Sequence, residues 1–340
     1  MGVTFNKSIR LDHLDGVELQ DWDFLPNQVT AHLESQGMRT DSGESMIFAL
    51  QLQHMRSQVL EREYPELKAK RLIPQQSESA PGDTEFAFTV ADKVGMFELI
   101  VNYADDLPLT DVKGEKYVVD INSFGGAFQY TVDDVEKANK AGVQLTSRKA
   151  ASNRDAAEQK FERIAWLGDE KSGAFGMLTV PNATKETAST KAASGTKWLD
   201  NATAEEVYKD LARPQIQQIT DTKGIERPNV YILTPQDLEY ARNVTFENNV
   251  NGESALQRFQ KRYPNVTVED SVYMEGAGAG STNVMLTYCN DPLKVAMETP
   301  LPYNVMAPQF RNLATIINAR MKTAGVIAYK PLSITIIEGL

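Results

Sequence analysis

The stretch that decides the fold is VQLTSRKAASNRDAAEQKFERIAWL (143–167), followed directly by GDEKSGAFGMLTVPNAT (168–184). The first part predicts a helix, because apolar residues from Val143 to Ile164 recur at the three-to-four spacing of one helical face. Such a helix would be roughly 35 Å long. Gly168 follows at once, and a left-handed glycine commonly ends a helix. We therefore predict a long helix that ends in a glycine-rich joint.

Two glycine-rich stretches could instead bind phosphate. A P-loop needs Lys and Ser/Thr after its second glycine, but Ala174 and Phe175 occupy these places. In addition, a phosphate-binding loop precedes a helix, whereas this stretch comes after one. The second stretch, EGAGAGST, lacks the third correctly spaced glycine of a dinucleotide fingerprint. We predict a structural joint at the first and an exposed, flexible loop tip at the second; the glycines are Gly168, Gly173 and Gly176, and Gly276, Gly278 and Gly280.

The composition is that of a folded protein. The chain has 340 residues, 41% hydrophobic and 24% charged, which is enough for more than one core. No apolar run approaches the roughly 20 residues that cross a bilayer, and no signal peptide is evident, so we expect a cytoplasmic protein without a membrane contact. The single Cys289 excludes an intramolecular disulfide. A net charge of -11 opposes tight binding to nucleic acid over a broad surface.

Catalytic chemistry finds no support in the sequence. The three histidines, His13, His32 and His54, lie near the N terminus and lack metal-ligand spacing. The motifs of serine hydrolases, zinc proteases and EF-hands do not occur. Asp105 and Asp106 stand beside Leu-Pro in a predicted turn, where a structural role is the simpler interpretation. The sequence therefore predicts no catalytic residue, no cofactor site and no metal site.

In the N-terminal third, the periodicity of the apolar residues changes along the chain. Residues 1–43 lack sustained periodicity and suggest an extended arm, and 44–64 have a helical pattern that ends before Pro65. In DTEFAFTV, Phe86 and Phe88 alternate with polar or small residues, which predicts a strand. We expect ADKVG to turn this strand into a hairpin with MFELIVNY, and ADDLPLTDVKGEK to form an irregular connection. KYVVDI and GGAFQYTV then predict further strands.

The C-terminal half has a different organisation. The Ser/Thr/Ala-rich segment 188–195 predicts an exposed, mobile loop. From Trp198 helical and strand patterns alternate, which indicates an α/β lobe. The predicted helices are 204–220, 236–244 and 253–263, and the predicted strands are 229–233, 266–268, 284–288 and 294–297, with more strand in the tail GVIAYKPLSITIIEGL.

Four local sequences then identify a family. They are YPELKAKRLIP (64–74), FTVADKVGMFELIVNYADDLPLTDV (88–112), YTVDDVEKANKAG (130–142) and ERIAWLGDEKSGAFGMLTVPN (162–182). Together with the order arm, strand excursion, long helix, joint, α/β lobe and returning strand, they resemble the major capsid proteins of tailed double-stranded DNA phages. The resemblance extends from about residue 45 to the C terminus.

The resemblance implies the fold and its division. The fold would be α+β, the tailed-phage major capsid protein fold, with an N-arm, an extended β-hairpin loop, a peripheral domain built on a long spine helix, and an α/β axial domain. The implied parts are the N-arm (1–43), a helix and connection of the peripheral domain (44–73), the extended loop (74–123), the peripheral domain (124–197) with its spine helix (143–167), the axial domain (198–299) and a return to the peripheral domain (300–340).

The resemblance also implies a structural function and no enzyme activity. Such proteins assemble into the pentamers and hexamers of an icosahedral head that encloses double-stranded DNA without sequence-specific binding. The implied partners are copies of the chain, a portal and a decoration protein. A separate scaffolding protein is also implied, since no long helical pro-segment precedes the arm. The implied location is the virion, after assembly in the host cytoplasm.

The extended loop supplies candidate subunit contacts, because an alternating apolar loop has little reason to project unless a partner covers it. The candidates are Phe86, Phe88, Lys93, Met96, Phe97, Asp105 and Asp106; the glycine-rich stretch at Gly276 would be an axial loop. Three alternatives stay open: an encapsulin-type nanocompartment shell with the same fold, a tail or neck adaptor that forms rings, and a cytosolic α/β enzyme that binds a divalent metal through Glu98, Asp105 and Asp106.

Overall fold

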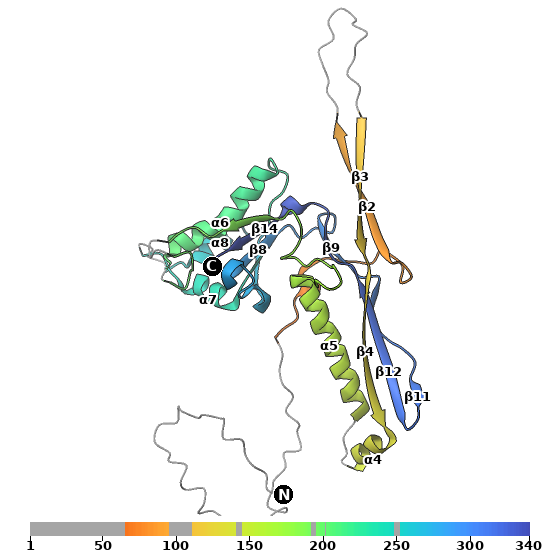
Figure 1. Cartoon of the computed structure of the whole chain (residues 1–340). Helices are drawn as coiled ribbons and strands as arrows, with labels where there is room; N and C mark the ends of the chain where they lie inside the picture. Colours follow the sequence, from red (N-terminus) through yellow and green to blue (C-terminus); the bar gives the residue numbers. More distant parts are fainter. Residues whose placement is uncertain (1–64, 95–110, 141–144, 192–194, 201, 248–251) are drawn as a thin grey trace, which may run out of the picture. The chain divides into compact units, whose positions relative to one another are not determined.

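The computed structural model describes residues 65–94, 111–140, 145–191, 195–200, 202–247 and 252–340 (Figure 1). The predicted arm and first helix, at 1–43 and 44–64, lie outside the described residues. The same holds for Met96, Phe97, Glu98, Asp105 and Asp106. In the part of the chain that is described, no helix is both long enough and apolar enough to cross a membrane.

The predicted long helix is α5, Leu145–Leu167. It packs on β4 (Asn122–Thr131), which pairs antiparallel with β12 (Ala314–Thr323) along its whole length (Figure 1). Burial is concentrated at the C-terminal end of α5, where Phe161, Ile164 and Trp166 enter the main hydrophobic core. The sheet continues on the other side of β12 with β10 (Leu301–Val305) and β11 (Gln309–Arg311).

A capping box starts α4 (Val132–Lys140) directly after β4. The Thr131 amide donates to the Asp134 carboxylate at 3.2 Å, and the Asp134 amide donates to the Thr131 hydroxyl at 3.1 Å. This reciprocal pair satisfies amides that the first helical turn leaves without partners. The Thr-x-x-Asp spacing therefore ends the strand and begins the helix.

The predicted α/β lobe is a five-stranded sheet, counted over the described residues, and its three helices. The strand order is β5 (Thr184–Thr187), β14 (Ile334–Glu338), β8 (Val284–Tyr288), β6 (Val230–Leu233) and β7 (Thr267–Asp270). Successive strand residues point to opposite faces, so Tyr231 and Leu233 join one core and Val230 and Ile232 the other. The first core holds the helices α6 (Ala204–Asp221), α7 (Pro235–Asn243) and α8 (Ala255–Arg262).

Strand partners differ from the predicted division at residue 299. β9 (Val295–Glu298) lies outside the five-stranded sheet and pairs with β1 (Gln75–Gln76) and β13 (Gly325–Ala328). The last strand, β14, belongs to the five-stranded sheet, although 300–340 was expected to return as a whole to the peripheral domain. Alternation of apolar residues predicts that a strand exists, but it does not identify the partner.

The hairpin also differs from the sequence prediction. β2 (Glu85–Val94) runs straight through the expected turn at ADKV and pairs antiparallel with β3 (Asp111–Asp120), part of which was expected to be irregular. Among the described strands, β2 and β3 pair only with each other, and we call this pair the ribbon. The polar residues of ADKV interrupt the apolar alternation of the strand, which is why they were wrongly interpreted as a turn.

The ribbon continues directly into the long sheet. A single residue, Ile121, separates β3 from β4, and its amide donates to the Thr84 carbonyl at 2.8 Å. Ile121 is buried in a small core with Phe86, Ala324 and Ile327. The chain therefore passes from one strand pair to the next almost without interruption.

The segment 188–195 was predicted to be exposed and mobile, and this was wrong for Ala188 and Lys191, which are buried. The Lys191 ammonium pairs with the Asp210 carboxylate on α6, and the Trp198 indole donates to the same carboxylate at 2.9 Å. The Ser189 hydroxyl donates to its other oxygen at 2.5 Å. Buried charges persist when they are paired and hydrogen-bonded, so this network fixes the segment against α6.

Candidate functional site

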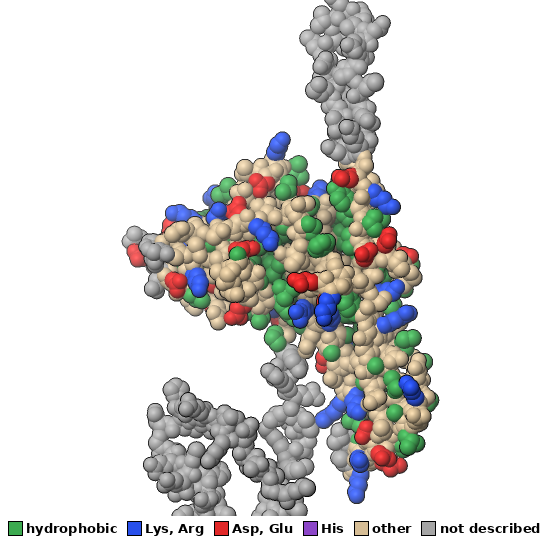
Figure 2. All heavy atoms as spheres, viewed as in Figure 1, with side chains coloured by type: hydrophobic (Ala, Val, Ile, Leu, Met, Phe, Trp, Pro, Cys, Tyr) green, Lys and Arg blue, Asp and Glu red, His purple; other side chains and the backbone are tan. Residues whose placement is uncertain are grey.

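One face of the ribbon is apolar, and its residues become more exposed with distance from the base of the ribbon. In an antiparallel pair, residues directly opposite each other lie on the same face, so Phe88 and Tyr117 share a face with Val90 and Glu115. The Phe88 and Tyr117 rings stack with 5.5 Å between centroids, and the Tyr329 ring meets Phe88 edge-on at 4.9 Å. Val90 and Tyr117 are exposed. Figure 2 shows hydrophobic side chains at the base of the ribbon.

The predicted contact residues occupy different places on the ribbon. We expected Phe86 to lie on an exposed surface, but it is buried by the chain's own residues. Phe88 is half-buried against the same cluster. Lys93 lies on β2 opposite Val112. A role of these residues in a subunit contact stays a prediction, and the other candidates of the loop lie outside the described residues.

The joint after α5 depends on close backbone approach. Gly168 has φ of 74° and Gly173 has φ of 69°, both in the left-handed region that favours glycine. A Cβ on Gly168 would lie 2.5 Å from the Ala174 carbonyl oxygen, and one on Gly176 would lie 2.7 Å from the Ile164 carbonyl oxygen. The Met177 amide donates to the Ala165 carbonyl at 2.8 Å. The chain thus folds back onto the last turn of the helix.

Asp169 adds an ionic contact to the joint. The Lys160 ammonium donates to its carboxylate at 2.7 Å, and the Ser172 amide donates to it at 3.2 Å. The hydrogen bond from Lys160, followed by those from Ser172, lowers the pKa of the Asp169 carboxyl. The ionised carboxylate therefore stabilises the turn.

Glu162 is a residue whose burial the sequence analysis did not predict. It is buried, and its carboxylate accepts hydrogen bonds from the Lys68 amide at 2.9 Å, the Ala69 amide at 2.9 Å and the Trp166 indole at 2.7 Å. It thus supplies the N-terminal cap of the short helix α3 (Ala69–Leu72). The Glu-x-x-x-Trp spacing is the one local signal of this contact.

Charges connect the same segment to the five-stranded sheet. The Lys68 ammonium donates to the Asp270 carboxylate at 2.8 Å, and the Arg71 guanidinium donates to Glu269 at 2.9 Å. Both acceptors lie at the end of β7. The basic residues of YPELKAKRLIP therefore hold the segment between the long helix and this sheet.

A groove lies beside the base of the ribbon. It has a volume of about 350 Å³, and its walls come from the ribbon, the joint and β13 with the residues after it. Exposed apolar residues on it include Tyr117 and Phe175, which are 45% and 40% exposed. The lining residues are Phe88, Val90, Tyr117, Val118, Val119, Phe175, Val180, Pro181, Asn182, Val326, Ile327, Ala328, Tyr329 and Pro331; we call this set the groove.

The turn between β11 and β12 presents a second apolar surface. Phe310 is 85% exposed and Leu313 is 77% exposed. Asn312, between them, has φ of 55°, which makes the turn tight. The Leu313 carbonyl accepts from the Val132 amide at 3.2 Å, so the turn is fixed to the start of α4. We call Phe310 and Leu313 the tip; the sequence signal, two large apolar residues around Arg-Asn, was not used in the prediction.

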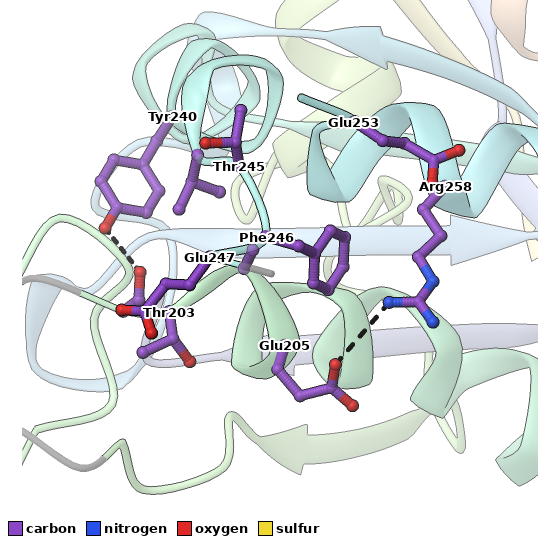
Figure 3. A pocket seen from close by; sticks show the side chains of 11 residues that line it. Thr203, Glu205, Tyr240, Thr245, Phe246, Glu247, Glu253 and Arg258 are labelled. Carbon is purple, nitrogen blue, oxygen red and sulfur yellow. Dashed lines mark hydrogen bonds and ion pairs between the residues drawn. The ribbon is translucent and has the colours of Figure 1, made fainter. Parts of the chain in front are cut away.

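A third surface is the pocket in Figure 3, where the N terminus of α6 meets α8 and the end of α7. Its volume is about 910 Å³. The Arg258 guanidinium lies 4.5 Å from the Phe246 ring centroid and 3.9 Å from the Glu205 carboxylate, and the Tyr240 hydroxyl donates to the Ala202 carbonyl at 2.7 Å. Arg258, Glu205 and Tyr240 are thus engaged with neighbours within the chain, which is typical of a structural surface.

The second glycine-rich stretch forms a turn next to β8. Gly276 and Gly280 have φ of 62° and 67°. The Ala279 amide donates to the Glu338 carboxylate at 3.0 Å, and the Gly278 amide donates to the Thr282 carbonyl at 2.9 Å. The glycines serve the backbone of an exposed turn, and a position at the capsomer axis stays a prediction.

Comparisons with known proteins identify the family. The chain resembles the solved capsid of the myovirus phage XM1, with 18% identity, 86% of this chain and 98% of that chain covered and a TM-score of 0.75. For the capsid of cyanophage P-SCSP1u the values are 11%, 88%, 95% and 0.60, and for the structure from Mycobacterium phage Ogopogo they are 10%, 86%, 98% and 0.59. No curated protein matches the chain. The family model described as major capsid protein matches residues 95–340. Because that match covers well over half of the chain, this protein belongs to the major capsid protein family.

Proposed function

We propose that the chain is the structural protomer of an icosahedral phage head, in which pentamers and hexamers enclose the packaged double-stranded DNA genome. The observation that carries the proposal is the ribbon, together with the family match. A two-stranded hairpin is marginally stable by itself, and this one exposes Val90, Tyr117 and Val118 to solvent. A neighbouring subunit would cover these residues in a shell.

The parts of the fold suit the roles that the family resemblance implies. The ribbon would be the extended loop that reaches over a neighbouring subunit, and α5 would be the spine helix of the peripheral domain. The five-stranded sheet and its helices would form the axial domain, which meets its copies at the capsomer centre. Phe88 and Lys93 stay candidates for the contact, whereas the buried Phe86 would anchor the base of the ribbon.

The charge of the chain suits an enclosing role. A net charge of -11 disfavours a tight grip on DNA, because affinity for phosphates comes mostly from Lys and Arg. We infer that the shell contains DNA without reading its sequence and acts as a structural protein, not an enzyme. A separate scaffolding protein, a portal and a decoration protein would be the partners of assembly in the host cytoplasm.

Electron microscopy of the expressed full-length chain, with and without its phage's scaffolding protein, tests the proposal. Regular shells or capsomers are the expected result. Open rings would favour the adaptor alternative, and discrete particles with metal-dependent turnover would favour the enzyme. Shells purified from infected cells should contain nuclease-resistant DNA; shells that contain a cargo enzyme in place of DNA would favour the nanocompartment.

A further inference from the structure

We propose that the tip of one copy inserts into the groove of a second copy, and that this contact joins subunits within the shell. The inference rests on the proposed function, because it needs several copies held side by side. It goes further by naming both surfaces of one contact: Phe310 and Leu313 on the β11–β12 turn, and the apolar walls at the base of the ribbon.

The groove has the chemistry of an unfilled apolar site. Its described lining carries no charged side chain, and Asn182 is the polar residue among apolar ones. Its volume of about 350 Å³ corresponds to roughly a dozen water molecules. Release of that water by an apolar side chain would be favourable. The groove therefore favours an aromatic or aliphatic insert over a charged one.

The tip has the matching chemistry in convex form. Phe310 and Leu313 flank a turn held by the β11–β12 ladder, in which Phe310 lies opposite Thr315 and Arg311 lies opposite Ala314. β12 is in turn fixed to β4 over ten residue pairs. The tip is thus a preorganised apolar projection, and a rigid insert loses little conformational freedom on binding.

The tip cannot fill the groove of its own chain. β12, from Ala314 to Thr323, separates the tip from β13, whose Val326 and Ala328 line the groove. Ten strand residues at about 3.3 Å each place the tip roughly 33 Å from the far end of β12, where β13 follows after Ala324. A second copy must therefore supply the insert. In the proposed contact each copy inserts its tip into one neighbour and receives the tip of another, which is a heterologous arrangement and can close a ring.

Charges beside the two surfaces are complementary. Arg311 lies next to Phe310 on the exposed tip. Glu115 lies opposite Val90 on the groove side of the ribbon, and the Tyr117 hydroxyl donates to its carboxylate at 2.8 Å. An inserted Phe310 would bring Arg311 to the rim where Glu115 lies. Such a pair at the rim sets the orientation of a contact more than its strength.

Disulfide trapping in assembled particles tests the contact. In a Cys289→Ala background, Phe310→Cys and Phe175→Cys are combined on one chain, with Leu313→Cys as a second choice for the tip. We expect oxidised shells to give a ladder of dimers and higher oligomers on a non-reducing gel, whereas each single-cysteine variant stays monomeric. Shells that form without a ladder would overturn the inference and leave the proposed function intact; absence of any shell from the unsubstituted chain would contradict the proposed function itself.

A charge exchange provides an independent test. Arg311→Glu and Glu115→Arg should each lower the ladder yield several-fold, and the double variant should restore it. A double variant no better than the single ones would refute the proposed pairing. Maleimide labelling of the Phe175→Cys variant shows whether another segment occupies the groove. If this cysteine is protected from maleimide in shells that give no disulfide ladder, a different segment fills the groove, which would also overturn the inference.

Discussion

Replacing Gly168 by alanine is expected to destabilise the joint far more than the same change at Gly173. Both glycines are left-handed, with φ of 74° and 69°. A Cβ on Gly173 would meet nothing within 4 Å, whereas one on Gly168 would lie 2.5 Å from the Ala174 oxygen and 2.8 Å from the Gly176 nitrogen. The pair therefore separates the cost of the backbone conformation from the cost of the clash.

The expected magnitudes follow from these contacts. The left-handed conformation costs a non-glycine residue about 1–2 kcal/mol, and this applies to both variants. At Gly168 the backbone at Ala174 must also move, which breaks the bonds from the Asp169 amide to Ala174 and from the Met177 amide to Ala165, at 2.9 and 2.8 Å. Each contributes roughly 1 kcal/mol net. We expect a loss of about 3–4 kcal/mol for Gly168→Ala and about 1–2 kcal/mol for Gly173→Ala.

Urea unfolding of the unassembled full-length chain, followed by circular dichroism, measures these losses. Gly176→Ala is the steric control: its φ lies outside the left-handed region, and its Cβ would press on the Gly168 nitrogen and the Ile164 oxygen. It should therefore destabilise the chain about as much as Gly168→Ala. Equal small losses for Gly168→Ala and Gly173→Ala would show that the joint relaxes freely, and would refute the reasoning.

Three further predictions concern charged groups. Glu162→Gln should cost about 1–3 kcal/mol in urea unfolding, because its carboxylate accepts from two backbone amides and an indole; an unchanged midpoint would contradict this. Lys191→Met should cost about 3–5 kcal/mol, since it leaves the Asp210 carboxylate buried without its cation, and adding Asp210→Asn should recover part of that loss; if the double variant is less stable than the single one, the pairing argument fails. The pKa of the Asp169 carboxyl is lowered in the native state. The ionised carboxylate therefore contributes to the stability of the folded chain above the ordinary pKa near 3.9, and this contribution disappears as the pH falls through the lowered pKa. Asp169→Asn should therefore be less stable than the natural chain at pH 7, and in thermal melts this difference should shrink as the pH falls below the ordinary pKa; a difference that stays constant would refute the ionic role.

Local patterns were sufficient to predict several elements. The three-to-four spacing predicted α5, and the glycine after it predicted where the helix ends. The sequence also predicted β8 at 284–288, and the helix signals predicted α6, α7 and α8 to within a few residues. These features depend on residues that are close in sequence, so a short stretch of the chain is sufficient to predict each of them.

Other features depended on residues far apart in the chain. The partners of β9 and β14 are chosen by packing, and neither strand differs in pattern from its neighbours. Glu162 and Lys191 look like solvated charges in sequence, and each is buried because a partner 94 or 19 residues away satisfies it. The groove likewise combines segments from the ribbon, the joint and β13, which no local window contains.

The nearly continuous passage from β3 to β4 has a mechanical consequence. Only Ile121 separates the two strands, so tension applied to the ribbon by a neighbour would pass along the same chain into β4. The ladder between β4 and β12 holds ten residue pairs, and its hydrogen bonds are perpendicular to the strands. A pull along β4 would load these bonds together in shear instead of opening them one after another. In a shell under internal pressure, the paired strands β4 and β12 would then bear the tension that the ribbon transmits from a neighbouring subunit.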